Sequence, residues 1–110
     1  MSSEISLDGW DIKRFEETDW VPWGGTGGHA RAKILGVADG FYIALIEAQP
    51  GYRGDAHEHE YPEFLSVIDG ELHNQGQPMV RGDGYAAAPG SSHSDFGTAT
   101  GSTYLLVFKI

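Results

Sequence analysis

The apolar residues of this chain come in short runs, and glycine-containing turns divide them. Three Asp-Gly pairs, beginning at Asp39, Asp69 and Asp83, lie between runs rich in β-branched and aromatic residues. Asp-Gly is a strong signal for a tight hairpin turn, and runs of this composition suit strands. No apolar stripe with the period of a helix is present. These features predict an all-β domain with tight hairpins.

Two of the runs, 41–46 and 64–68, carry large apolar side chains at both odd and even positions. Successive side chains of a strand point to opposite faces, so both faces of such a strand must be covered. The interior of a barrel would cover one face. We expect the N-terminal segment or a second subunit to cover the other, which predicts a homodimer.

The composition limits the partners. The chain has 110 residues, which is enough for one domain with a core, and a formal net charge of −9. That charge argues against a nucleic acid or an anionic membrane surface as partner. The absence of cysteine excludes disulfides and thiolate ligands, and neither a secretory leader nor a membrane-length apolar run is visible. We expect a cytoplasmic protein that acts on a small molecule.

Residues 1–28 differ in character from the rest of the chain. They contain Trp10, Trp20 and Trp23, and the run 24–28 has four glycines. We expect an N-terminal arm whose tryptophans pack on the outside of a domain formed by residues 29–110. The alternative is a lid over the functional site, with the glycines as its hinge.

The residues best suited to chemistry lie in the stretch 51–70 and in one later turn. His57 and His59 stand two apart, so a strand would place both on one face, and Glu63 has the same parity. His93 follows in a Pro-Gly-Ser-Ser-His turn. Imidazole and carboxylate together suit zinc, iron, manganese, nickel or copper better than calcium. We interpret these four residues as the ligands of one divalent transition-metal ion.

The stretch 51–70 resembles the first motif of the cupin superfamily, G-x5-H-x-H-x3-E-x6-G, and matches every fixed position. The second motif, G-x5-P-x-G-x2-H-x3-N, is matched in part, because Ala88 stands for its proline and Gly97 for its asparagine while His93 is kept. The resemblance implies a small RmlC-like double-stranded β-helix, or jelly-roll barrel, with a metal site. The matching positions are Gly51, His57, His59, Glu63, Gly70, Gly82, Gly90 and His93.

A closer resemblance is to the single-domain cupins of the ChrR type, carried by the runs 61–65, 70–72, 88–94 and 104–109. That type includes the metal-binding half of zinc anti-sigma factors and dioxygenases that act on diketones or aromatic ketones. The resemblance implies either a metal-dependent dioxygenase of that kind or a non-enzymatic metal-binding or sensing module. An isomerase or lyase that acts on a sugar derivative is a third alternative.

The identity of the metal distinguishes these functions. Zinc held tetrahedrally by all four ligands would be closed and structural, whereas octahedral iron, manganese or nickel would keep two positions open. A Glu63 that leaves the metal could act as a catalytic base toward a carbon next to a carbonyl. We expect Fe(II) or zinc, with manganese or nickel as alternatives.

Four further residues are candidates for supporting roles. Asp95 could hold a ligand imidazole in the correct tautomer, as carboxylates near metal sites do. His73 could line the barrel, although we expect it at the surface. Tyr61 and Tyr85 are expected as polar contacts at the mouth of the cavity.

Overall fold

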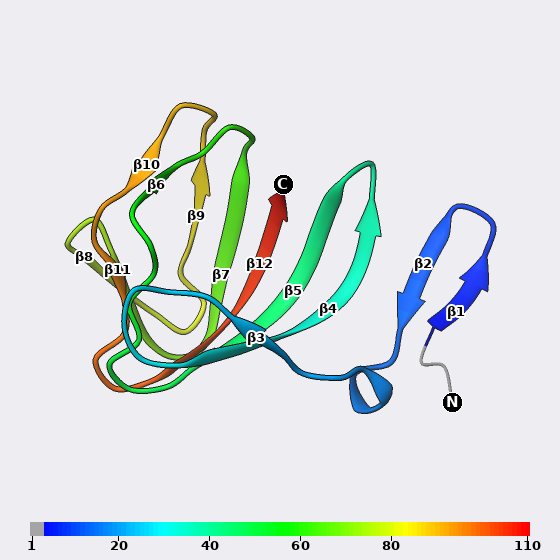
Figure 1. Cartoon of the computed structure of the whole chain (residues 1–110), viewed down its shortest axis with the longest axis horizontal. Coiled ribbons are helices and arrows are strands. Elements are labelled where there is room, and N and C mark those ends of the chain that lie inside the picture. The colour runs from blue at the N-terminus through cyan, green and yellow to red at the C-terminus, as the bar shows by residue number, and fades with distance from the viewer. Residues whose placement is uncertain (1–3) are drawn as a thin grey trace.

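The computed structural model describes residues 4–110, with side chains from Leu7 onward (Figure 1). The described chain consists of strands, short turns and one 3₁₀ helix, with no α-helix, which confirms the all-β prediction. In chain order the elements are β1 (Glu4–Leu7), β2 (Trp10–Lys13), η1 (Phe15–Glu17), β3 (Val21–Trp23), β4 (Ala30–Ala38), β5 (Phe41–Ala48), β6 (His57–Glu58), β7 (Glu63–Asn74), β8 (Gln77–Val80), β9 (Gly84–Ala87), β10 (Ser92–His93), β11 (Phe96–Gly97) and β12 (Ser102–Lys109).

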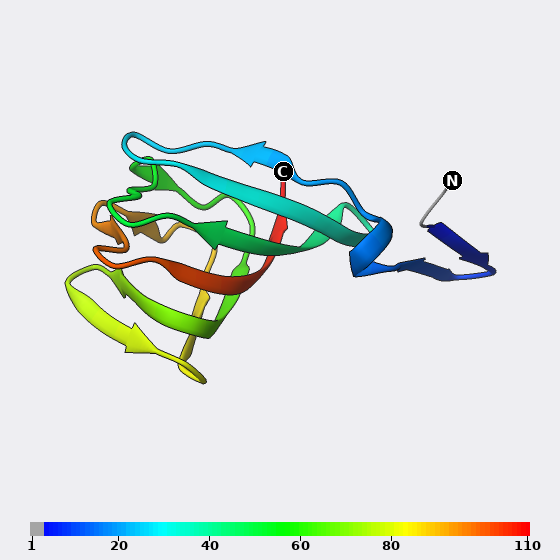
Figure 2. The ribbon, with the colours of Figure 1, turned by 90° about the horizontal axis from the view of Figure 1, so that it is seen from below.

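The strands form an open jelly-roll barrel, as expected. An eight-stranded sheet runs in the order β11-β7-β12-β5-β4-β3, and β8 and β9 also pair with β7. β6 and β10 form a separate two-stranded sheet at one side of the barrel (Figures 1 and 2). Among the described residues no helix has the length and apolar character needed to cross a membrane.

The interior is filled by alternate residues of the central strands. On β12, Tyr104 and Leu106 point inward, and β5 and β7 contribute side chains of the same kind. This alternation is the two-residue period of strands with one buried face. The buried apolar residues are Ala32, Ala44, Ile46, Ala48, Tyr52, Leu65, Val67, Leu72, Met79, Tyr104 and Leu106.

The hairpin predicted at Asp69–Gly70 is wrong, because β7 continues through it. Thr103 of β12 faces Asp69 and Tyr104 faces Val67, which leaves Ile68 as an extra residue on β7. Gly70 has a φ of 78°, a conformation that glycine adopts readily. An extra residue beside a left-handed glycine is a β-bulge, which bends the strand.

The bulge also changes which residues of β7 face the interior. Leu65 and Val67 are buried before it, at odd positions, whereas Leu72 is buried after it, at an even position. β7 thereby pairs with β12 and β9 along its first half and with β8 along its second half. The Asp39–Gly40 pair does form the expected turn, between β4 and β5, and both residues have positive φ.

The first part of the chain is spread over three locations. The β1–β2 hairpin extends beyond the barrel, and Trp10 is 71% exposed there (Figures 1 and 2). Trp20 packs on the outside, with the Arg31 guanidinium 4.0 Å from its ring centroid. β3 is an edge strand of the main sheet, and its Trp23 packs against Phe108. The division into an arm (1–28) and a domain (29–110) stays a prediction.

The glycine-rich run 24–28 packs closely on the segment 51–53. A Cβ on Gly25 would lie 2.4 Å from the carbonyl oxygen of Arg53, and one on Gly28 would lie 2.6 Å from the Cα of Tyr52. The Arg53 amide donates a hydrogen bond to the Gly27 carbonyl. These glycines therefore allow two backbones to approach each other, a role different from that of a hinge.

Candidate metal centre

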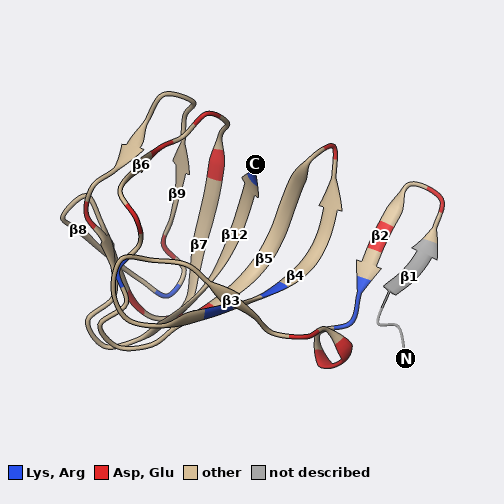
Figure 3. Cartoon of the chain, viewed as in Figure 1, with Lys and Arg blue, Asp and Glu red and all other residues tan. Residues whose placement is uncertain are grey.

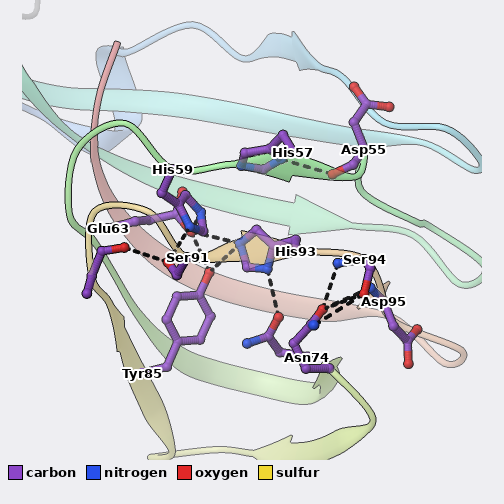
Figure 4. Close-up of polar contacts among 12 residues, drawn as sticks. Asp55, His57, His59, Glu63, Asn74, Tyr85, Ser91, His93, Ser94 and Asp95 are labelled. Carbon is purple, nitrogen blue, oxygen red and sulfur yellow. Dashed lines mark hydrogen bonds and ion pairs between the residues drawn. The ribbon is translucent and has the colours of Figure 1, made fainter.

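The four residues interpreted as ligands lie together inside the barrel (Figure 4). Each offers one ligand atom, and all four atoms lie within 4.8 Å of one another. His57 on β6 and His93 on β10 are register partners, His59 follows β6, and Glu63 begins β7. The three imidazole centroids are 4.5–5.0 Å apart. This cluster has the composition and spacing needed to hold a metal ion.

His93 is held by an amide from the far end of β7. Its Nδ1 donates a hydrogen bond to Oδ1 of Asn74 at 2.7 Å, because an amide oxygen can only accept. This assignment leaves the lone pair of Nε2 directed at the centre of the cluster. There Nε2 lies 3.2 Å from Oε2 of Glu63.

His59 is oriented by a serine of the turn before β10. Its Nδ1 lies 2.9 Å from Oγ of Ser91, whose hydroxyl donates to the carbonyl of Ala88 at 2.6 Å. The serine proton is thus engaged, so Oγ accepts from Nδ1 and the lone pair of His59 is on Nε2. The turn forms around Ala88, the position where the cupin motif has a proline.

His57 is the exposed member of the cluster. Its Nδ1 donates to the backbone carbonyl of Asp55 at 2.9 Å, which again leaves Nε2 free to bind a metal. No side chain among the described residues anchors this imidazole by a hydrogen bond. All three histidines therefore present Nε2 as the ligand atom.

Glu63 receives a hydrogen bond from a tyrosine that sequence analysis placed at the cavity mouth. The Tyr85 hydroxyl donates to Oε2 at 2.6 Å (Figure 4). Burial acts to raise the pKa of the Glu63 carboxyl, but hydrogen bonds from His93 and Tyr85 and the charge of the imidazoles lower it below its usual 4.5. Burial, followed by the Glu63 charge, raises the pKa of Tyr85 far above its usual 10. The carboxylate is thus kept ionised and the phenol protonated.

The electrostatics of this cluster fit a bound cation. His59 is 7% exposed, and its Nε2 is buried without a hydrogen bond to any described residue. Nδ1 of His93 donates to Asn74, so Nε2 can donate to Glu63 only when the imidazole carries a second proton. In neutral His93, Nε2 and Oε2 of Glu63 face each other as two lone-pair donors. A metal ion held by these residues would satisfy these atoms and would take the place of the second proton on His93. Burial lowers the pKa of His59, which favours the neutral form that binds metal.

None of the three remaining candidates is hydrogen-bonded to a ligand imidazole. Asp95 pairs with His73, with Oδ1 3.2 Å from Nε2, and orients no ligand imidazole. Asn74 and Ser91 perform that role, and sequence analysis identified neither. Tyr61 is exposed, and its ring centroid lies 5.0 Å from Nζ of Lys109.

A cavity of about 230 Å³ opens beside the cluster. His57, Glu63 and His93 border it, and the rest of the wall is largely aromatic. Burial raises the pKa of Tyr52 to about 12, with a further contribution from the charge of Asp55. The remaining lining residues are Trp23, Gly24, Tyr52, Gly54, Asp55, Tyr85, Phe96, Tyr104 and Leu106.

The sequence matches the family model of the ChrR cupin-like domain over residues 11–109. No curated protein sequence matches the chain. The family match covers nearly the whole length and includes the four clustered residues.

Several solved structures share the fold. A candidate acetylacetone dioxygenase from Methylibium petroleiphilum superposes with a TM-score of 0.82 at 18% identity, over 99% of this chain and 81% of its own. An acetylacetone dioxygenase from Acinetobacter johnsonii gives 0.74 at 15% identity, over 82% and 67%. A protein from Thermotoga maritima predicted to be an oxalate decarboxylase gives 0.74 at 22%, over 88% and 96%. At these identities the likeness establishes the fold alone, and one fold hosts many activities.

Proposed function

Because this chain belongs to the ChrR cupin-like domain family, we propose that it is a metal-dependent dioxygenase acting on a small diketone or aromatic ketone. One divalent transition-metal ion, Fe(II) for this activity, would be held by His57, His59, Glu63 and His93. When bound, such an ion supplies Lewis acidity and one-electron chemistry toward dioxygen. The proposal includes a cytoplasmic location, which suits a chain without cysteine.

The observation that carries this proposal is the cavity beside the cluster. A structural metal site needs no adjoining space for a ligand, whereas this cavity is bordered by three of the four clustered residues. Its wall combines aromatic surfaces with a few polar groups, the usual character of a small-molecule site. A small carbonyl compound in this cavity would lie against the metal ligands.

The residues of the chain have separable roles in this proposal. Glu63 borders the cavity, so a Glu63 carboxylate that leaves the metal is the candidate base that takes a proton from the carbon next to the substrate carbonyl. Tyr85 holds the same carboxylate in place through its 2.6 Å hydrogen bond. Asn74 and Ser91 fix the imidazole tautomers of His93 and His59.

The test is oxygen consumption by protein reconstituted with a single metal. We expect the Fe(II) form to consume dioxygen with at least one member of a panel of β-diketones, and the zinc form to consume none, because zinc has no redox chemistry. His29→Ala, which alters an exposed histidine outside the cluster, is the control and should retain the activity. An inactive Fe(II) form with full metal content would refute the enzyme proposal.

A non-enzymatic metal-binding or sensing module is the second candidate. Four side chains close enough to surround one ion could close a tetrahedral zinc site, and the family is defined by ChrR. Full zinc occupancy after purification without added metal, combined with no turnover after iron reconstitution, would favour this module.

We also propose that the protein is a homodimer. Outward side chains of β5 and β7 remain exposed, among them Ile43 at 36% and Phe64 at 46%. The β1–β2 hairpin packs against β4, where the Asp11 carboxylate accepts a hydrogen bond from the Val37 amide. A two-fold interface through β5, β7 and part of the segment 1–28 would cover these residues.

Light scattering at micromolar concentration tests the dimer. We expect the mass of a dimer for the native chain and of a monomer for Phe64→Asp, which places a charge in the proposed interface. Val80→Asp, at an exposed apolar position on β8, is the matched control and should stay dimeric. A monomeric native chain would contradict the proposal.

A further inference from the structure

One hydroxyl in the cavity wall has no partner within the protein. Tyr104 is 1% exposed, lines the cavity from β12, and makes no hydrogen bond through its hydroxyl to any residue in the described range 4–110. Burying a hydroxyl without a partner costs stability, and phenylalanine would fill almost the same space without that cost. Position 104 therefore carries a hydroxyl that forms no hydrogen bond within the described part of the folded chain.

The other two tyrosines of the cavity differ from Tyr104 in this respect. The Tyr52 hydroxyl donates to the carbonyl of Gly24, and the Tyr85 hydroxyl donates to Glu63. Both hydroxyls are thus committed to holding the wall. Tyr104 is the tyrosine of this wall whose hydroxyl has no hydrogen-bond partner among the described residues. Burial raises its pKa, so the hydroxyl stays a donor.

The charge of the cavity restricts what that molecule can be. The charged residues of the wall are Asp55 and Glu63, both acidic, and the wall contains no lysine or arginine. In Figure 3, β7 begins with an acidic residue, and β6 and β9 carry no basic one. A carboxylate or phosphate on the ligand would find no lysine or arginine in this wall, and a metal ion held by the cluster would be its one counter-charge there. A neutral oxygen acceptor suits it better.

We propose that Tyr104 is a specificity residue whose hydroxyl donates a hydrogen bond to a carbonyl oxygen of a small ligand without a carboxylate or phosphate group. The cavity volume of about 230 Å³ suits a small ligand. Phe96 contributes an apolar surface to the same wall, with its ring centroid 5.9 Å from that of Tyr104 and 5.0 Å from that of His93. The choice of ligand class rests on the proposed function, but the inference concerns binding and requires no catalysis.

The first test measures binding to the zinc-loaded protein, in which no turnover is expected. By calorimetry, Tyr104→Phe should bind 2,4-pentanedione about tenfold more weakly than the native chain, the loss expected for one hydrogen bond. Tyr42→Phe removes the same atom from a residue outside this cavity and should bind unchanged. Acetoacetate, which carries a carboxylate in place of one methyl ketone, should bind more weakly than 2,4-pentanedione.

A second test separates a ligand-binding hydroxyl from a structural one. Without ligand, Tyr104→Phe should melt at the same temperature as the native chain or higher, because it removes a buried polar atom that has no partner. Tyr52→Phe should melt lower, because it leaves the Gly24 carbonyl without its donor. Opposite effects of these two substitutions would identify Tyr104 as a group kept for a ligand.

Several outcomes would overturn the inference. These are equal affinity of the native chain and Tyr104→Phe for 2,4-pentanedione, no binding of that probe by the native chain, tighter binding of acetoacetate, or a lowered melting temperature of Tyr104→Phe. If the Fe(II) protein consumes no dioxygen while Tyr104→Phe still weakens binding, the dioxygenase proposal fails and the inference about Tyr104 stands.

Discussion

His93 and His57 face each other in register across β10 and β6, yet the protein holds them in different ways. His93 is 6% exposed and is fixed by the side chain of Asn74, whereas His57 is exposed and, among the described residues, its imidazole is hydrogen-bonded to a backbone carbonyl alone. His59, fixed by Ser91, belongs with His93 in this respect. The contrast indicates that His93 and His59, which form the inner side of the centre, are oriented before a metal binds. His57 lies at the exposed rim of the centre and completes the ligand set.

The largest effect should come from removing either histidine of this pair. We expect His93→Ala and His57→Ala each to lower metal affinity by more than about a hundredfold, since orienting groups alone account for 10–100-fold. Metal content after dialysis, measured by mass spectrometry, checks this. Normal occupancy in both variants would show that the cluster is not the metal centre.

Removing the group that orients His93 should have the next largest effect. Asn74→Ala should lower metal affinity about 10–100-fold, because His93 loses the acceptor that fixes its tautomer. Asn74→Asp keeps an oxygen acceptor and should recover most of that loss. Equal affinities of Asn74→Ala and the native chain would mean that His93 is no more preorganised than His57.

A smaller effect should distinguish His93 from His57 in the stability of the metal-free protein. His93→Ala leaves the Asn74 amide without its partner, so the free energy of unfolding should fall by about 1–3 kcal/mol. His57→Ala frees only an exposed carbonyl and should leave that free energy nearly unchanged. Denaturant titration of the two metal-free variants makes the comparison, and equal losses would remove the distinction between inner side and rim.

The smallest effect is the pH dependence of the stability of the metal-free protein, which comes from His59 and Glu63. The folded state lowers the pKa of His59 below 6.5 and that of Glu63 below 4.5. The unfolded chain therefore binds more protons than the folded chain as pH falls through these values, so the metal-free protein should lose stability on acidification, first below about 6.5 and further below about 4.5. Denaturation midpoints between pH 7.5 and pH 4, about the range these pKa values define, measure this. Glu63→Gln should flatten the acidic part of the curve, and a native midpoint constant with pH would contradict the prediction.

The fold and the composition of the cluster could be predicted because they depend on local patterns. The i, i+2 spacing of His57 and His59 sets their common direction in any extended backbone. Short apolar runs between glycines require strands wherever those strands lie. Such signals are contained within a few neighbouring residues.

The supporting residues could not be predicted because they depend on register between distant segments. Asn74 reaches His93 only through the path of β7, and that path was misjudged at Asp69–Gly70. The error has a physical reason, because the left-handed glycine that favours a hairpin turn equally favours a bulge in a continuing strand. Ser91 likewise acquires its role only when the turn before β10 folds against His59.

The bulge in β7 limits how the length of this strand can change during evolution. Glu63 and Asn74 have opposite parity, so an unbroken strand would direct them to opposite faces, yet both reach the same centre. The extra residue at Ile68 reconciles the two directions. Deleting a single residue between them would turn either a ligand or its support outward. β7 can therefore tolerate many exchanges of one side chain for another, but insertions and deletions should be confined to the loops outside it.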